Sequence, residues 1–240
     1  QPPRRTWEHA GELLRMLDAI DDDGSITALG RRMVDLPLHP RLAHLVAVSP
    51  TTAACVVAAV IDERDVMRGR PRELPADLEL RVAAVGGRRS DDRIDRRAAA
   101  RVSDRAADIA RRAGVRFDLD EVDPGRTGLL LVGAFPDRLA GRRRGGQFQL
   151  RTGGRVWVPD DDPLASAEFI VAAELDGKRE GAQVLRGAAV EAWEIAGLLD
   201  DVVVDEMLVW DTDRDDLIVR RTRRLDALHL GEEIDRPQPG

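Results

Sequence analysis

The sequence predicts an α+β protein whose helices come first and whose strands come second. As far as residue 134, apolar residues recur at the three- and four-residue spacing of amphipathic helices, with Pro, Gly and short polar residues at the segment ends. From residue 147 onward they alternate with polar residues, and Gly-rich turns separate the runs. We expect this second half to form a small, mostly antiparallel barrel, and an OB-like barrel is one of the few folds that fit.

Residues 1–46 fit a winged-helix module, because a helix over 7–20, a turn, a short strand and a second helix follow one another. Thr27 is the predicted N-cap of the second helix, since its hydroxyl can accept a hydrogen bond from an amide in the first turn. Met33 lies on the apolar stripe of that helix. Proline then ends this helix and opens the next one, so residues 36–41 should form a corner between them.

Residues 47–120 predict a helical bundle. The helix that Ser49 opens is apolar almost all round, which is typical of a buried helix, and it contains Cys55. Because Cys55 is the only cysteine, no intramolecular disulfide can form, and a reducing cytoplasm is the expected location. We expect Ser90 to cap a later helix, which ends in arginines followed by Gly114, as the helix dipole and a left-handed terminus favour.

Residues 121–200 should hold the OB-like domain, and residues 201–240 a C-terminal β extension. In the OB-like domain, predicted strands around Phe148 and Trp157 flank a Gly-Gly turn. A helix follows the strands, and we expect Trp193 to face inward from it. The longest apolar run of the chain is about ten residues, too short to span a bilayer, so we expect no membrane partner.

Positive charge concentrates in two segments, although the chain as a whole carries a net charge of −7. Residues 64–116 contain 15 Arg against 9 acids, and residues 138–155 contain six Arg and no acid. Lys178 is the only lysine, so the cations are guanidinium groups, which suit bidentate contacts with phosphate. The codon bias of a GC-rich genome also accounts for this excess of arginine.

Several motifs occur in a characteristic order. Leu-Pro-Leu-His-Pro-Arg-Leu-Ala at 36–43 is followed by Phe-Pro-Asp-Arg-Leu-Ala at 135–140, an Arg-rich loop and Asp-Pro-Leu-Ala at 162–165. Together they resemble the winged-helix, ratchet and OB-like regions of DEAH-type RNA helicases. The bacterial HrpB-like branch is the most similar, because eukaryotic members have His-Pro-Ser-Ser where this chain has residues 159–163. The resemblance covers roughly residues 1–190, and the tail is only loosely similar to the C-terminal extension of that branch.

The resemblance implies that the chain is the C-terminal accessory region of an ATP-dependent RNA helicase. Such a region covers the motor, forms the far wall of an RNA channel and converts nucleotide-driven domain motion into strand translocation. The implied partners are single-stranded RNA and the RecA-like motor domains of the same parent chain. Residue 1 is Gln rather than Met, so we expect the chain to begin inside a longer protein.

We predict no catalytic residue and no metal ligand in this chain. The sequence contains neither the G-x-x-x-x-G-K-[ST] loop that holds nucleotide phosphates nor Asp-Glu-Ala-His. Lys178 follows a Gly but precedes Arg179, so it does not complete such a loop. ATP and Mg²⁺ would therefore be cofactors of motor domains outside this chain, and we expect no ATPase activity from this chain alone.

Two sets of arginines are candidates for RNA contact. One set forms an i, i+4 row in the part that resembles the ratchet, although a solvated face paired with neighbouring acids explains it equally well. The other set brackets a Phe in the segment without acids, where the alternative is a core ring beside an exposed loop. The candidate RNA-binding residues are Arg93, Arg97, Arg101, Arg105, Arg142, Arg143, Arg144, Phe148, Arg151 and Arg155.

Two other functions also fit the sequence. A free-standing RNA-binding or protein-interaction adaptor, without any motor, would use the same modules. A winged-helix DNA-binding regulator is the third, but its presumed recognition helix carries only Arg31 and Arg32 as strong base readers. The sequence assigns neither the RNA nor the oligomeric state.

Overall fold

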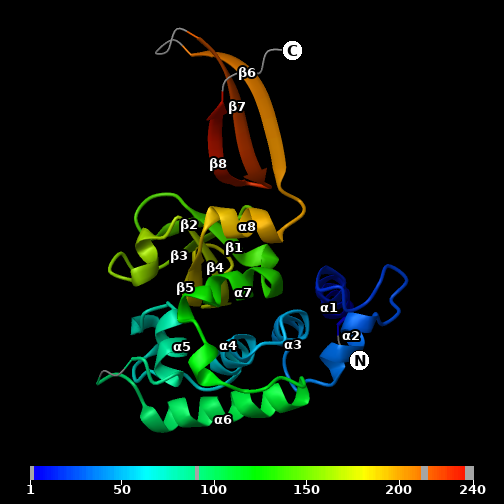
Figure 1. Cartoon of the computed structure of the whole chain (residues 1–240), viewed down its shortest axis with the longest axis vertical. Coiled ribbons are helices and arrows are strands. Elements are labelled where there is room, and N and C mark those ends of the chain that lie inside the picture. Colours follow the sequence, from blue (N-terminus) through cyan, green and yellow to red (C-terminus); the bar gives the residue numbers. More distant parts are fainter. Residues whose placement is uncertain (1–2, 90–91, 212–215, 236–240) are drawn as a thin grey trace.

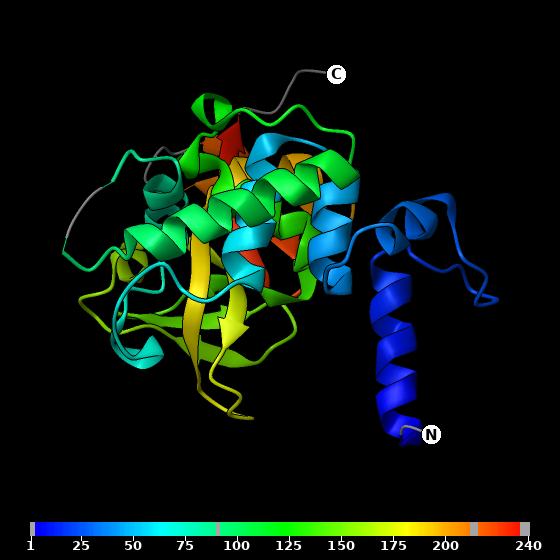
Figure 2. The ribbon, with the colours of Figure 1, turned by 90° about the horizontal axis from the view of Figure 1, so that it is seen from below.

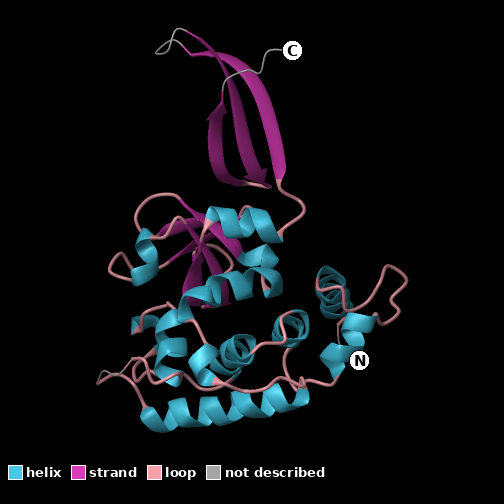
Figure 3. Cartoon of the chain, in the orientation of Figure 1, coloured by secondary structure: helices cyan, strands magenta, loops and turns pink. Residues whose placement is uncertain are grey.

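The helices of the N-terminal half pack at one end of the molecule, the barrel lies in the middle, and a three-stranded sheet projects from the other end (Figures 1 and 3). The computed structural model describes residues 3–89, 92–211 and 216–235. The helices are α1 (Arg4–Met16), α2 (Ala28–Val34), α3 (Pro40–Val48), α4 (Thr52–Asp62), α5 (Glu79–Val85), α6 (Arg96–Arg112), α7 (Thr127–Ala134) and α8 (Ala192–Leu198). The strands are β1 (Leu139–Arg142), β2 (Gln147–Leu150), β3 (Arg155–Trp157), β4 (Phe169–Leu175), β5 (Ala182–Val190), β6 (Val203–Asp211), β7 (Asp216–Leu225) and β8 (Leu228–Asp235). The predicted α+β class is therefore confirmed.

The N-terminal module is built around the start of α2. Thr27 caps this helix as predicted, and its Oγ1 accepts a hydrogen bond from the amide of Gly30 at 2.9 Å. Gly30 has no room for a side chain, because a Cβ there would lie 2.0 Å from the carbonyl oxygen of Ala19. Met33 is buried as predicted. α1 ends earlier than predicted, because the chain turns at Asp18, whose φ is +50°, and α1 projects from the helical layer (Figure 2).

α4 occupies the centre of the helical layer, where it packs against α3, α5 and α6. It is almost entirely buried, as predicted, and burial raises the pKa of the Cys55 thiol to about 11. Its N-cap is Thr51 rather than Ser49, since the Thr51 hydroxyl accepts a hydrogen bond from the amide of Ala54 at 3.2 Å. No helix of the described residues is both long enough and apolar enough to cross a membrane.

α6 begins later than predicted. Its N-cap is Asp95, whose carboxylate accepts two amides of the first turn, whereas Ser90 lies outside the described residues. The segment before α6 is extended and pairs with an earlier one. The amide of Asp95 donates to the carbonyl of Val66 at 2.8 Å, and the carbonyl of Arg93 accepts from the amide of Arg68 at 2.7 Å. Because this pairing holds the backbone extended, the helix starts only after it.

The barrel closes through the strand order β1-β2-β3-β5-β4, with β1 also pairing with β4. Every pair is antiparallel except β3 with β5, so the barrel is mixed rather than purely antiparallel. This five-stranded closure confirms the small barrel that the alternation predicted. α7 packs so closely on β5 that a Cβ on Gly128 would lie 1.7 Å from the carbonyl oxygen of Ala189.

β6, β7 and β8 form a separate antiparallel sheet, which we call the tail sheet. Within the predicted C-terminal β extension, the sequence predicts a hairpin of residues 202–210 and 217–224. It corresponds to β6 and β7, and its turn lies outside the described residues, whereas β8 was not predicted. At the base of the sheet, Leu225 and Leu228 are buried in the main core. Farther along it, Met207, Leu208 and Trp210 are exposed.

The prediction that Trp193 faces inward is wrong. Its side chain is 73% exposed, and Ile195 is the residue of α8 that enters the core. Two residues along a helix are separated by roughly 200°, so the two side chains lie on nearly opposite faces.

Candidate nucleic-acid interface

The outer face of β2 and β3 carries polar and aromatic side chains at alternate positions. Successive residues of a strand point to opposite faces, so the buried Phe148 enters the barrel while its neighbours point outward. The antiparallel register sets Gln147 opposite Trp157 and Gln149 opposite Arg155. These four outward side chains therefore share one surface.

A groove of about 550 Å³ lies on this surface, and we call it the β2–β3 groove. Trp157 is half-buried there, and its Nε1 donates a hydrogen bond to the carbonyl of Gly181 at 3.0 Å, which fixes the ring. No carboxylate is among the described residues that line the groove, so the charges of its arginines are not neutralised within it. The lining residues are Arg143, Gln147, Phe148, Gln149, Gly153, Arg155, Val156, Trp157 and Gly181.

The β1–β2 connection brings further positive charge to this side of the barrel, whereas the β4–β5 turn carries Asp176 and Glu180 beside its two cations. In the β1–β2 turn, the guanidinium of Arg143 donates a hydrogen bond to Oε1 of Gln149. The β4–β5 turn reaches the groove at Gly181. The exposed cations of the two turns are Arg142, Arg143, Arg144, Lys178 and Arg179. The exposed arginines at residues 142–144 suit contact with a phosphate backbone beside the groove.

A second groove, of about 500 Å³, lies between α6 and the barrel. The exposed side chains of Arg64, Arg68 and Arg101 line it. Its carboxylates already have partners, and one partner is a groove arginine, since Nε of Arg68 lies 3.9 Å from the carboxylate of Asp95. Asp65 accepts hydrogen bonds from a buried arginine of α5, and Glu174 lies 3.2 Å from an arginine of β5. Arg64 and Arg68 were not among the predicted RNA-binding residues. In the sequence, only their position in the arginine-rich segment 64–116 points to them.

Comparison of the sequence with known proteins points to one group of helicases. Residues 12–38 match the helicase associated domain (HA2), winged-helix. The chain is 29% identical over 178 residues to the ATP-dependent RNA helicase HrpB of Escherichia coli (strain K12), which covers 72% of this chain and 19% of that protein. It is 30% identical over 94 residues to the pre-mRNA-splicing factor ATP-dependent RNA helicase prp22 of Schizosaccharomyces pombe (strain 972 / ATCC 24843), which covers 38% of this chain and 8% of that protein.

Solved structures extend this similarity to the whole chain. The crystal structure of E. coli DExH-box NTPase HrpB has a TM-score of 0.72 at 25% identity and covers 100% of this chain and 28% of that one. In sequence and fold, the chain matches the C-terminal region of HrpB-like DEAH-type helicases. The crystal structure of Escherichia coli DEAH/RHA helicase HrpB agrees, with a TM-score of 0.70 at 26% identity over 97% of this chain and 27% of that one. This HrpB-like region spans about a fifth of the length of E. coli HrpB.

The structure of this HrpB-like region corrects the role predicted for Phe148. Its side chain is only 1% exposed inside the barrel, so the prediction of a ring on which a base stacks is wrong, and the core alternative holds. Trp157 on the next strand is only partly buried and lines the groove instead. The alternation Val-Trp-Val at 156–158 carries the signal that would have found it, since a residue between two inward-facing valines points outward.

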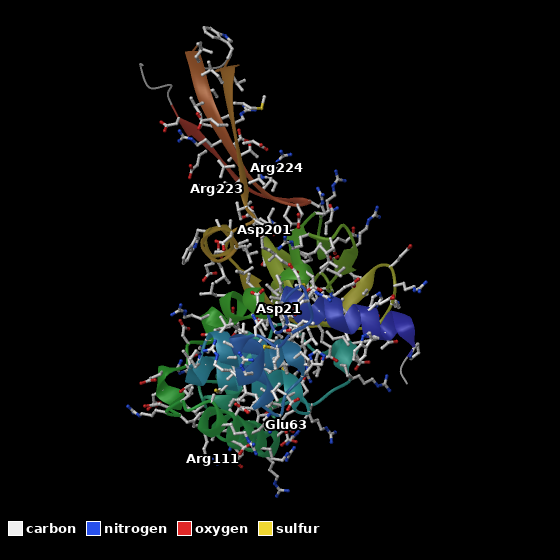
Figure 4. All side chains as sticks on the ribbon, turned by 90° about the vertical axis from the view of Figure 1, so that its right-hand side faces the viewer. Asp21, Glu63, Arg111, Asp201, Arg223 and Arg224 are labelled. Atoms are coloured by element: carbon white, nitrogen blue, oxygen red, sulfur yellow. The ribbon has the colours of Figure 1, made fainter. Side chains whose placement is uncertain are left out.

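Arg151, a predicted RNA-binding residue, is occupied by other contacts. Its side chain is 12% exposed, and its guanidinium pairs with the carboxylates of Asp201 and Asp226. Asp201 lies where the tail sheet meets the barrel (Figure 4). Arg151 therefore joins the barrel of the HrpB-like region to its tail sheet, and its charge is already matched.

The predicted row of arginines on α6 is shorter than expected. Arg93 precedes the helix in the extended segment, so it does not continue the row. Arg105 lies 2.9 Å from the carboxylate of Asp62 and ties α6 to α4. Arg97 and Arg101 remain as the exposed pair on this helix.

The remaining ionisable groups of the HrpB-like region include one strongly shifted carboxyl group. In the described part of the chain, no group of three or more His, Cys, Asp or Glu side chains is placed to hold a metal ion. Glu79, at the start of α5, is the carboxyl group with a large pKa shift. Burial raises its pKa to about 7, and the charges of Asp77, Asp123 and Glu194 act in the same direction.

Proposed function

We propose that this chain is the accessory part of an ATP-dependent RNA helicase and that it binds single-stranded RNA in the β2–β3 groove. The observation that carries the proposal is the groove, in which Arg143 and Arg155 accompany the partly buried Trp157 with no carboxylate among the described lining residues. Guanidinium groups bind the phosphates and the ring stacks on a base, a combination typical of single-strand sites. The corresponding face of OB-folds binds oligonucleotides.

The connections between the helical layer and the barrel support a role in coupling. Arg186 of β5 donates hydrogen bonds to the carbonyls of Val60 and Ile61 at the end of α4, both at 3.1 Å. Arg41, at the start of α3, forms a two-point ion pair with Asp137 at the entrance to β1. Through these connections the helices and the barrel move together, so a displacement imposed on the helices by a motor domain reaches the strand held in the groove.

Exposed apolar side chains at both ends of the chain supply the contact with RecA-like motor domains of the same parent chain. Trp7 of α1 is exposed, and so are Met207 and Trp210 of the tail sheet. Large apolar side chains that gather at the surface mark protein–protein contacts. ATP and Mg²⁺ are bound by those motor domains, and this chain alone hydrolyses no ATP.

Trp157→Ala tests the RNA site. Affinity of the 240-residue chain for a fluorescently labelled single strand, measured by anisotropy, should fall by roughly tenfold, because stacking of one base contributes about 1–3 kcal/mol. Trp193→Ala is the matched control, since Trp193 is exposed on α8 and lies outside the groove. If both variants bind as tightly as the unmodified chain, or if the unmodified chain binds no RNA, the proposed site is wrong.

A protein-interaction adaptor without a motor is the second candidate function, because the exposed Met207, Leu208 and Trp210 fit a separate protein partner as well as they fit a motor domain. The reading frame upstream of residue 1 distinguishes the two. A G-x-x-x-x-G-K-[ST] loop and Asp-Glu-Ala-His in that frame support the helicase, whereas a start codon directly before this chain supports the adaptor.

A further inference from the structure

We infer that Arg72 is a positioning residue for the RNA site, because it connects the turn that holds the Trp157 ring to the helical layer. The inference rests on the proposed function, since it concerns the ring on which a base of the bound strand stacks. Arg72 is not among the described residues that line the β2–β3 groove, so we expect its effect on RNA to act through that ring.

The ring of Trp157 is held by the β4–β5 turn, residues 176–181. Its Nε1 donates a hydrogen bond to the carbonyl of Gly181, the last residue of the turn, at 3.0 Å. The parallel register of β3 and β5 sets Gln183 beside Trp157, two residues after Gly181. The position of the ring therefore depends on the position of this turn.

Asp176 closes the turn at its base. Its amide donates to the carbonyl of Gln183 at 3.0 Å, and its Oδ1 accepts hydrogen bonds from the amides of Lys178 and Gln183, each at 3.2 Å. The side chain of Asp176 is only 2% exposed. Because a buried carboxylate that loses its cation is strongly destabilising, the partner of Asp176 bears on the geometry of the turn.

Arg72 is that partner, and it comes from a different part of the chain. It lies in the short 3-10 helix η1 (Pro71–Glu73), and its Nη2 is 3.2 Å from Oδ2 of Asp176, closer than Nζ of Lys178 at 3.9 Å. The carbonyl of Arg72 also accepts a hydrogen bond from Nε2 of Gln183 at 3.1 Å. One residue thus contacts both the first residue of the turn and the strand that follows the turn.

η1 is anchored in the helical layer. Leu74, which follows η1 directly, is buried in the main core together with side chains of α4 and α6. Val184, which follows Gln183, is buried in the separate core inside the barrel. Arg72 and Gln183 therefore join two packed units, and a displacement of the helices relative to the barrel would reach the Trp157 ring through them.

Arg72→Met tests the inference, and Arg70→Met is the matched control, since Arg70 carries the same charge in the same segment but pairs with Glu73 at the surface. Affinity of the 240-residue chain for a labelled single strand of about eight nucleotides is measured by anisotropy. Arg72→Met should lower the affinity by roughly fivefold, within the range for side chains coupled in one network. Arg70→Met should change it by less than about twofold, because salt screens the loss of one exposed charge. Arg72→Lys, which keeps a cation near Asp176, should recover most of the affinity.

A double-mutant cycle shows whether Arg72 acts through the ring. In the Trp157→Ala background, Arg72→Met should have no further effect on affinity. The ring itself is followed without RNA, in a chain whose other three tryptophans are replaced by phenylalanine, so that Trp157 is the only tryptophan that emits. Quenching of its emission by acrylamide should increase in Arg72→Met and stay the same in Arg70→Met, because only the first variant frees the turn.

Thermal unfolding followed by circular dichroism checks that each variant folds, and Gln183→Leu, which removes the second contact, is used if Arg72→Met does not fold. Unchanged affinity or unchanged quenching in the Arg72→Met chain overturns the inference. An equal loss of affinity in the Trp157→Ala background also overturns it, since Arg72 would then contact the strand directly. These outcomes leave the proposed function standing, whereas no binding of any strand by the unmodified chain removes the proposed function and the inference with it.

Discussion

Arg41 and Asp137 lie 96 residues apart in the sequence and form a two-point ion pair, with Nη1 to Oδ1 at 2.7 Å and Nη2 to Oδ2 at 2.9 Å. The Nη1 of Arg41 also donates to the carbonyl of Ala134 at 2.9 Å, and its guanidinium carbon lies 5.1 Å from the centroid of the Phe135 ring. The pair thus brings together the two motifs on which the family resemblance first rested. These motifs are adjacent in space because one supplies the buried cation and the other its carboxylate.

Arg41→Met should lower the free energy of unfolding by about 2–4 kcal/mol, because it leaves Asp137 without the partner of a largely buried pair. Urea unfolding followed by circular dichroism measures the change. Arg116→Met is the control, since Arg116 pairs with Asp118 at the surface and such pairs contribute at most about 1 kcal/mol. Similar small losses in the two variants would show that the Arg41 pair does not hold the helices to the barrel.

Met33→Asp should place a charge in an apolar interface, cost several kcal/mol and unfold the N-terminal half cooperatively. Val34→Asp offers a control one residue away on the same helix, because Val34 is exposed. Thermal melts of the two variants should differ clearly. If Met33→Asp melts like the unmodified chain, α2 is not packed as described.

The arginines of the β1–β2 turn should set the salt dependence of RNA binding. If Arg142, Arg143, Arg144 and Arg155 neutralise three to four phosphates, the log–log salt slope should be roughly −2 to −3 at about 0.7 per contact. Changing Arg142, Arg143 and Arg144 together to Gln should flatten the slope by about 2 and weaken all sequences similarly, because phosphate contacts carry no sequence information.

The competing surface is tested by changing Arg97 and Arg101 together to Gln. If only this variant flattens the slope, the RNA runs along α6 and the second groove. If neither variant alters the binding of a single strand, neither set of arginines contacts RNA. The adaptor function is then favoured over the helicase function.

Phe148→Ala should destabilise the barrel by about 3–5 kcal/mol, because it removes a large side chain from a closed interior. Phe148→Leu should cost less, since it fills most of the same space. Compared with Phe148→Ala, Trp157→Ala should cause a smaller loss of stability and a larger loss of RNA affinity. RNA affinity is compared under conditions in which both variants are folded. If Phe148→Ala and Trp157→Ala then lower the affinity equally, Phe148 contacts the RNA.

Glu79 should make stability depend on pH near neutrality. Burial, together with the nearby carboxylates of Asp77, Asp123 and Glu194, raises its pKa from 4.5 to about 7, so the folded state binds the proton more tightly than the unfolded state. The stabilisation is complete below about pH 4.5 and is lost as the pH rises to about 7. Unfolding is measured at several pH values for the unmodified chain and for Glu79→Gln, which mimics the protonated acid.

The free energy of unfolding of Glu79→Gln should exceed that of the unmodified chain by about 1 kcal/mol above pH 7, after allowance for partial solvent screening. The difference should vanish toward pH 4.5. Glu73→Gln is the control, because Glu73 is exposed on the surface. A constant difference between Glu79→Gln and the unmodified chain would show that Glu79 titrates normally.

Local sequence signals predicted the fold where local interactions decide it. The cap at Thr27 and the proline corner were found because a cap and a proline act within one turn of helix. The start of α6 was missed because residues 93–95 pair with residues 66–68, a contact that no local pattern shows. β8 was missed for the same kind of reason, since it forms by pairing with β7.

The candidate site likewise depends partly on local sequence and partly on tertiary contacts. Arg143 and Arg155, both from the segment without acids, line one groove, and their contact with RNA stays a prediction. Arg151 and Arg105 look identical to them in the sequence, but their partners Asp201 and Asp62 are distant along the chain. An arginine is available to a ligand only when the fold leaves it without a carboxylate, and that depends on tertiary contacts.

The tail sheet is attached to the barrel at its base, and side chains farther along it, such as Met207 and Trp210, are exposed. Arg151 holds Asp201 and Asp226 at the base, and Arg223 and Arg224 lie farther up the sheet (Figure 4). A strand as long as β6 extends about 30 Å at roughly 3.3 Å per residue. A tilt of about 5° at the base therefore displaces the far end by nearly 3 Å, about the length of one residue. Any rotation at the base, where Arg151 pairs with Asp201 and Asp226 and where Leu225 and Leu228 enter the core, would therefore be largest at the far end of the sheet.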